Sequence, residues 1–180
     1  MRTLFGDPIN FTYKPKKFEL MSVKAEIISI GDELLYGQTL DTNAHWMSNK
    51  LDENNIKVFQ RTTIGDDEEQ ILNALKVAEK RVDIVLITGG LGPTKDDLTK
   101  PLLAKYFGVK MVHHEQVLKD ITLLFSKANR EVTALNARQA ELPANCEKIT
   151  NPVGTAPGMW FHENNTVFVA MPGVPYEMKS

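Results

Sequence analysis

Hydrophobic residues recur along this chain with the two periods typical of strands and of amphipathic helices. An almost uninterrupted apolar run at residues 82–87 (VDIVLI) predicts a central strand that is covered on both faces. Further strands are predicted at 24–30 and 56–64. Helices are predicted at 42–54, 66–80, 99–107, 115–129 and 133–141. Because strands and helices alternate, the pattern predicts an α/β fold: a parallel sheet with helices on both faces.

The two ends of the chain differ from this pattern. Residues 1–22 show neither period, so we expect a flexible extension outside the core, with Met21 as a candidate native start that mass spectrometry would test. Near the other end, a short strand at 148–150 precedes a hairpin with arms at 159–162 and 166–170. Residues 176–180 are typical of the first turn of a helix, which indicates that a further domain is missing.

Composition excludes several classes of function. The net charge is −2, so no strong positive field attracts nucleic acid or an anionic membrane. A single cysteine, Cys146, rules out an internal disulfide and fits a reducing, cytoplasmic environment. No apolar run reaches the roughly 20 residues of a membrane span.

The strand at 82–87 ends in a glycine-rich turn, Thr88-Gly89-Gly90-Leu91-Gly92. A turn of this kind, at the carboxyl end of a buried strand and before a helix, is typical of sites that bind phosphate groups. The alternative is a tight turn with no ligand. Asp96 and Asp97 directly after the turn favour a site, because a turn alone does not require two carboxylates. The spacing is neither that of a P-loop nor that of a dinucleotide fingerprint.

Three pairs of acidic residues follow three predicted strands: Asp32-Glu33, Asp66-Asp67 and Asp96-Asp97. In a parallel sheet these corners lie side by side, and crowded carboxylates favour a hard cation that bridges to phosphate. For Asp66-Asp67 the alternative is a capping box with Glu69. The loops at 154–158 and 172–175 are expected to reach the same edge.

Other candidates point less clearly to function. Lys95 is either a phosphate ligand or a solvated loop lysine. His113 and His114 are adjacent, which fits surface polarity better than a metal site. Trp46 and Trp160 are interpreted as core residues and not as stacking platforms. A G-x-S-x-G elbow is missing, so acyl transfer is not predicted.

Four motifs in order carry a family resemblance: GDELLYGQTLDTN (31–43), TGGLGPTKDDLT (88–99), NPVGTAPG (151–158) and MPGVPYEM (171–178). They resemble the N-terminal domain of the competence/damage-inducible CinA family, within the wider molybdopterin-binding (MoCF biosynthesis) superfamily. The resemblance covers about residues 23–180. It implies a three-layer α/β/α fold with a mainly parallel sheet, a small β-hairpin subdomain and a homo-oligomer. The resemblance further implies a C-terminal nicotinamide-mononucleotide amidohydrolase domain in full-length relatives, and we do not expect that activity from residues 1–180.

The resemblance also implies an activity, the metal-dependent hydrolysis of ADP-ribose to AMP and ribose 5-phosphate without a Nudix box. Asp97 and Asp96 would be catalytic and, with Asp32, would bind a divalent metal (Mg²⁺, Mn²⁺ or Co²⁺), with K⁺ as a further cation. Leu91 stands where the pterin-handling relatives have threonine. The substrate-binding residues would be Asp32, Glu33, Asn43, Thr88, Gly89, Gly90, Gly92, Thr94, Gly154, Ala156, Gly158, Pro172 and Gly173.

Two rival functions remain open at this point. The first is binding or adenylylation of molybdopterin, which copurified pterin fluorescence would reveal. The second is a nucleotide-binding domain without turnover, for which ADP-ribose would bind but release no AMP.

Overall fold

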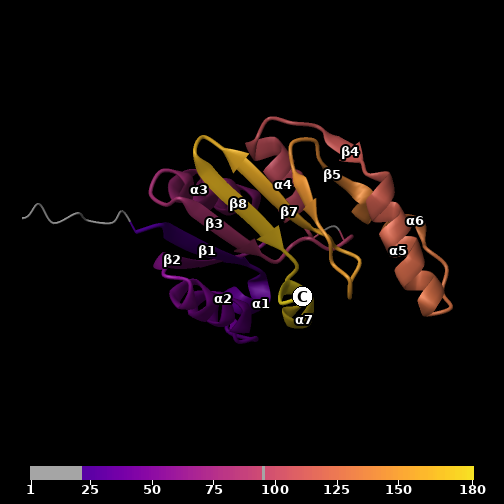
Figure 1. Cartoon of the computed structure of the whole chain (residues 1–180), viewed down its shortest axis with the longest axis horizontal. Coiled ribbons are helices and arrows are strands. Elements are labelled where there is room, and N and C mark those ends of the chain that lie inside the picture. Colours follow the sequence, from indigo (N-terminus) through magenta and orange to yellow (C-terminus); the bar gives the residue numbers. More distant parts are fainter. Residues whose placement is uncertain (1–21, 95) are drawn as a thin grey trace, which may run out of the picture.

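The computed structural model describes residues 22–94 and 96–180; the expectations for residues 1–21 and for Lys95 lie outside these ranges. A six-stranded sheet, in the order β2-β1-β3-β8-β7-β6, forms its centre (Figure 1). Its strands are β1 (Lys24–Ile30), β2 (Lys57–Ile64), β3 (Ile84–Thr88), β6 (Glu147–Ile149), β7 (Gly158–Glu163) and β8 (Thr166–Met171).

The pairing of these strands brings four carboxyl ends to one edge of the sheet. β1 pairs in parallel with both β2 and β3, and β3 pairs in parallel with β8. β7 then pairs antiparallel with β8 and with β6. The predicted central strand is therefore interior, and the loops after β1, β2, β3 and β8 meet at a common edge.

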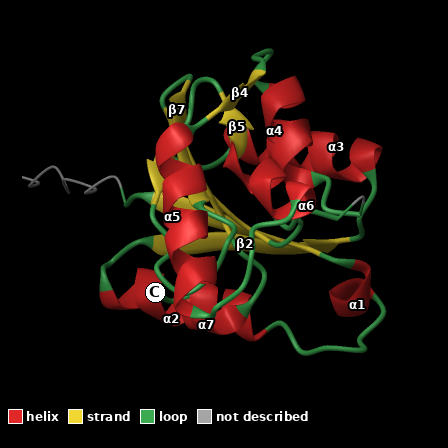
Figure 2. Cartoon of the chain, turned by 90° about the vertical axis from the view of Figure 1, so that its right-hand side faces the viewer, coloured by secondary structure: helices red, strands yellow, loops and turns green. Residues whose placement is uncertain are grey.

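Helices cover both faces of the sheet, which gives three layers (Figure 2). They are α1 (Asp32–Leu35), α2 (Thr42–Glu53), α3 (Glu68–Glu79), α4 (Thr99–Tyr106), α5 (Glu115–Lys127), α6 (Ala134–Ala137) and α7 (Pro175–Met178). Alternate residues of β1 point to opposite layers, as strand geometry requires. Ala25 and Ile27 pack with α2 and α7, whereas Ile28 and Ile30 belong to the core under α3, α4 and α5.

The predicted fold class is confirmed, with two corrections in its details. The hairpin at β7 and β8 is part of the main sheet and not a separate subdomain, because β8 is buried on both sides and pairs with β3. The small separate sheet is instead made by β4 (Met111–His113) and β5 (Glu141–Pro143), which the sequence did not predict. The helix expected at 133–141 is accordingly shorter: α6 is followed by a 3₁₀ turn, Arg138–Ala140.

Local sequence explains most helix boundaries. The sequence offers Asp41 or Thr42 as the cap of α2, and in the structure Asp41 is the N-cap and accepts a hydrogen bond from Ala44 N. Gly108, with a positive φ of 66°, follows the end of α4, where its lack of a side chain permits this conformation. Trp160, expected in the core, is 40% exposed, because it lies on the face of β7 opposite the buried Met159 and Phe161.

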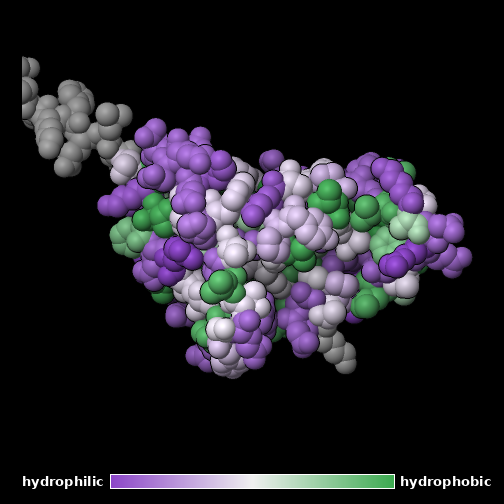
Figure 3. Space-filling model, turned by 90° about the horizontal axis from the view of Figure 1, so that it is seen from below, coloured by the Kyte–Doolittle hydropathy of each residue, from purple (hydrophilic) through white to green (hydrophobic). Residues whose placement is uncertain are grey.

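The outer surface is mixed in character. Hydrophobic residues are scattered among hydrophilic ones on the side of the molecule shown in Figure 3. Within residues 22–94 and 96–180, every helix is too short or too polar to cross a membrane.

Candidate functional site

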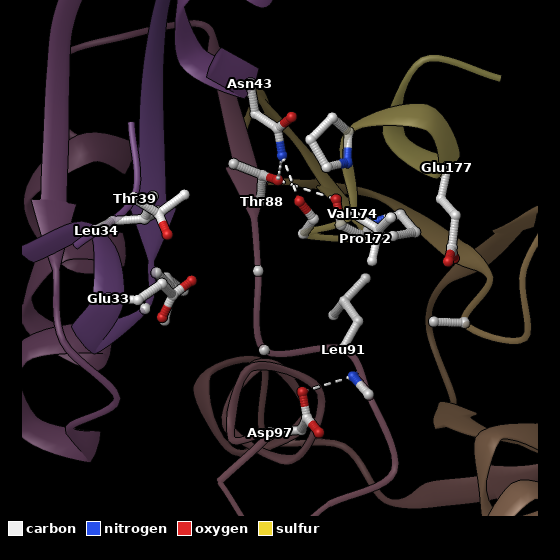
Figure 4. Close-up of a pocket in the computed structure, with 18 of the residues that line it drawn as sticks. Glu33, Leu34, Thr39, Asn43, Thr88, Leu91, Asp97, Pro172, Val174 and Glu177 are labelled. Carbon is white, nitrogen blue, oxygen red and sulfur yellow. Dashed lines mark hydrogen bonds between the residues drawn. The ribbon is translucent and has the colours of Figure 1, made fainter. Parts of the chain in front are cut away.

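A cavity of about 580 Å³ opens at the edge of the sheet where β1, β3 and β8 end. Glu33, Thr88, Asp97 and Glu177 come from four separate segments of the chain and surround it (Figure 4). The predicted convergence of distant turns is thus present in the structure, and it follows from the parallel pairing of β1, β3 and β8.

The floor of the cavity is the glycine turn after β3. Gly89 and Gly90 have φ values of 106° and 63°, which L-residues with a side chain rarely adopt. A Cβ on Gly89 would lie 2.1 Å from the carbonyl oxygen of Ile30, and a Cβ on Gly173 would lie 3.3 Å from Gly89 Cα. Glycine is therefore required here because three backbone segments approach one another closely.

This turn leaves backbone donors at the cavity. The N–H groups of Gly90 and Leu91 make no hydrogen bond to any residue that the structure describes. The described lining also contains no lysine, arginine or histidine. Backbone amides are therefore the donors that the turn presents to an anionic ligand.

Asp97 holds the loop that follows the turn. Its Oδ1 accepts a hydrogen bond from Gly92 N (2.8 Å) (Figure 4). Its Oδ2 accepts from Thr94 N (2.9 Å) and from the Thr94 hydroxyl (2.5 Å). A carboxylate has about four acceptor positions, so Oδ1 keeps one position for a ligand. The aspartate expected to act on substrate thus also shapes the loop.

Further carboxylates line the same cavity. Asp66 lines the cavity together with Glu33 and Asp96. Burial raises the pKa of the Asp66 carboxyl, and the charges of Asp32, Glu33 and Asp97 raise it further, while a hydrogen bond from Asp32 N opposes them. Because nearby negative charges disfavour ionisation of Asp66, a bound cation would stabilise its charged form.

The capping-box interpretation of Asp66 is wrong. The N-cap of α3 is Asp67, whose side chain accepts a hydrogen bond from Gln70 N. Asp66 is the residue before the cap, so its carboxylate is free to face the cavity. One position along the chain separates the capping residue from the site residue.

A buried polar network closes the opposite wall. Asn43 Nδ2 donates to Thr88 Oγ1 (3.0 Å) and to the carbonyl oxygen of Gly173 (2.7 Å), and the Thr88 hydroxyl donates to the carbonyl oxygen of Pro172 (3.0 Å). Asn43 Oδ1 is buried and has no partner among the described residues. An unpaired buried acceptor carries a free-energy cost that a donor group on a ligand would remove.

Most of the predicted site residues line the cavity. These are Glu33, Asn43, Thr88, Gly89, Gly90, Gly92, Asp96, Asp97, Ala156, Pro172 and Gly173.

Four predicted residues lie outside the lining. Asp32 exchanges hydrogen bonds with Asp66 at the ends of β1 and β2, and Thr94 binds Asp97. Gly154 packs against Glu177. Gly158 is the first residue of β7 and pairs with Ile149, so the structure does not bring it to the cavity.

The sequence did not indicate two further lining residues, Glu177 and Gln139. Glu177 stands in the MPGVPYEM motif, so its motif was a usable signal. Gln139 is flanked by ordinary residues of a 3₁₀ turn and carried no signal of its own.

The carboxylates of the cavity could supply only some of the ligands of a hard divalent ion. Among the residues that the structure describes, no three acidic, histidine or cysteine side chains are grouped closely enough to form a metal site by themselves. Mg²⁺ is commonly bound by one or two carboxylates, with phosphate oxygens and water completing the shell. Asp96 and the free position on Asp97 are the groups that suit such a site, whereas Asp32 is outside the cavity.

Comparison with known proteins defines the class to which this fold and cavity belong. The family of the probable molybdopterin binding domain matches residues 26–180. The chain therefore belongs to the molybdopterin-binding domain family.

Its relatives within this family are CinA-like. It is 48% identical over 157 residues to a CinA-like protein of Cytophaga hutchinsonii and 45% identical to a putative competence-damage inducible protein of Clostridium botulinum. These matches cover 87% of this chain but only 38% of each relative's length.

Solved structures agree with this assignment. The crystal structure of CinA from Thermoplasma acidophilum is 35% identical, with a TM-score of 0.80 over 88% of this chain and 92% of that one. MoaB of Thermus thermophilus, 17% identical with a TM-score of 0.55 over 87% and 85% of the two chains, shares the fold. The CinA-like resemblance predicted from the four motifs is confirmed.

Proposed function

We propose that this cavity binds ADP-ribose and hydrolyses its diphosphate to AMP and ribose 5-phosphate. The observation that supports this most directly is the glycine turn, whose two unpaired N–H groups lie beside a group of carboxylates in one cavity. Amides of this kind bind phosphate oxygens, and the carboxylates suit a divalent ion that neutralises the diphosphate. The volume of about 580 Å³ is that of a typical small-molecule site.

In the proposed reaction, the oxygen of water bonds to one phosphorus and the bridging oxygen leaves with the other phosphate. The N–H groups of Gly90 and Leu91 stabilise the negative charge that develops on the phosphoryl oxygens. Asp97 keeps these amides in place through Gly92 and Thr94. Asp66, with its raised pKa, is the carboxylate best suited to accept a proton from water. A divalent ion, held by Asp96 and Asp97 with phosphate oxygens and water, would supply Lewis-acid polarisation of the phosphate.

The experiment compares Asp66→Asn and Asp97→Asn with Asp67→Asn as the matched control. Asparagine caps a helix as well as aspartate does, and Asp67 is outside the cavity, so the control should retain full activity. We expect both cavity variants to lose at least a hundredfold in kcat for ADP-ribose hydrolysis, measured as AMP by chromatography with Mg²⁺, Mn²⁺ or Co²⁺. Normal hydrolysis by Asp97→Asn would refute the assignment. Binding of ADP-ribose without AMP release by the unsubstituted chain would favour a non-catalytic domain.

Molybdopterin binding is the second candidate, and the family match is the observation that favours it. Asn43 Oδ1, a buried acceptor without a partner, also suits the N–H groups of a pterin ring. Pterin fluorescence that copurifies with the chain, together with no hydrolysis of ADP-ribose, would support this candidate over the first.

A further inference from the structure

Gln139 is a cavity residue with an unusual environment. It lies in the 3₁₀ turn Arg138–Ala140, far along the chain from the glycine turn, and is only 1% exposed. Gln139 is nevertheless one of the residues that line the cavity. Buried glutamines are uncommon, because a primary amide must find partners for two donors and an acceptor.

A buried lysine fixes the orientation of this amide. Lys100, 5% exposed, donates from Nζ to Gln139 Oε1 (2.6 Å) and to the Gln139 carbonyl oxygen (3.3 Å). An ammonium group has donors only, so the amide atom that faces it must be the oxygen. The Nε2 group consequently faces away from Lys100, and a flipped amide is excluded by the charge.

This Nε2 group has no acceptor. It is buried, and no described residue accepts a hydrogen bond from it. An unpaired buried donor is unfavourable, so the arrangement is explained if a ligand supplies the acceptor.

The position of Lys100 indicates what kind of acceptor this is. Lys100 is in the first turn of α4, next to Thr99, whose N–H donates to the Gly90 carbonyl oxygen. Lys100 is therefore a cation one residue from the contact that joins α4 to the glycine turn, while the described lining of the cavity is acidic or neutral. Its charge polarises the amide and strengthens the Nε2 donor.

We propose that Gln139 is a ligand-binding residue whose Nε2 donates to a phosphate oxygen, and that Lys100 positions it for this contact. This deepens the proposed function, since it concerns the phosphate-binding part of the same cavity. Gln139 and the N–H groups of Gly90 and Leu91 would then contact one phosphate group together.

The test compares two probes that differ by a phosphate only, AMP and adenosine, by calorimetry in the presence of Mg²⁺. The variants are Gln139→Leu, Gln139→Glu and Lys100→Met, with Gln116→Leu on the exposed part of α5 as the matched control. Gln139→Glu retains an acceptor for Lys100 but has no donor for phosphate, so it separates a binding role from a structural one. Urea denaturation confirms that each variant folds.

We expect Gln139→Leu to weaken AMP binding at least tenfold and Gln139→Glu to weaken it more, because a carboxylate repels phosphate. Lys100→Met should weaken it as well, and adenosine affinity should stay within twofold in every variant. The proposal is overturned if both Gln139 variants bind AMP as the original chain does, if AMP and adenosine are weakened equally, or if the original chain binds AMP no better than adenosine. Failure of hydrolysis alone overturns the proposed reaction and leaves this inference standing, since binding is measured without turnover.

Discussion

Replacing Gly89 by alanine should destabilise the chain far more than the same change at Gly37. Both glycines have a positive φ, 106° and 73°, so each alanine carries a backbone strain of about 1–2 kcal/mol. At Gly37 no atom lies within 4 Å of the new Cβ, whereas at Gly89 the Cβ would stand 2.1 Å from the Ile30 carbonyl oxygen. Moving backbone in a packed core adds about 2–3 kcal/mol. We therefore expect about 1 kcal/mol for Gly37→Ala and about 3–5 kcal/mol for Gly89→Ala.

The measurement is urea denaturation followed by circular dichroism. With an m-value of about 2 kcal/mol per molar urea, the midpoint should fall by roughly 0.5 M for Gly37→Ala and by roughly 1.5–2.5 M for Gly89→Ala. Gly89→Ala should also lose affinity for AMP even at low urea, because the turn and the end of β1 must move apart. Equal midpoints for the two variants would refute the argument that close backbone approach, and not φ alone, requires Gly89.

Two further predictions concern buried charges. Glu26 is fully buried and accepts hydrogen bonds from Arg81 Nε (2.7 Å) and Nη2 (2.6 Å). Glu26→Gln should therefore lower the free energy of unfolding, measured by urea denaturation, by about 3 kcal/mol. The control Glu53→Gln, in an exposed ion pair with Lys50, should lower it by less than about 0.5 kcal/mol. A loss of under 1 kcal/mol at Glu26 would contradict this. Burial lowers the pKa of Lys100 from 10.5 to about 8, despite the opposing charge of Asp97. Between these pH values the folded chain releases a proton that the unfolded chain keeps, so stability should rise with pH, by about 3 kcal/mol relative to Lys100→Met. Parallel pH–stability curves for the two proteins would show that Lys100 is not desolvated.

Local sequence is sufficient to predict some of the strands and helices of this chain but not others. The strand at 82–87 and the helix after Asp41 were predictable because apolar spacing and an N-cap act within a few residues. β4 and β5 were not, since three-residue strands carry too little pattern and exist only through their pairing with each other. The hairpin was recognised, but its place in the main sheet depends on the pairing of β8 with β3.

The candidate site divides in the same way. The sequence by itself determined the glycine turn and the acidic corners and predicted that they meet at one edge, because parallel strands bring their carboxyl ends to the same edge. Only the tertiary structure decided which of these acids line the cavity: Asp66 does, whereas Asp67 caps α3. It alone also placed Gln139 against Lys100. Such roles depend on hydrogen bonds between residues distant in the chain, and the spacing of hydrophobic residues along the sequence does not predict those contacts.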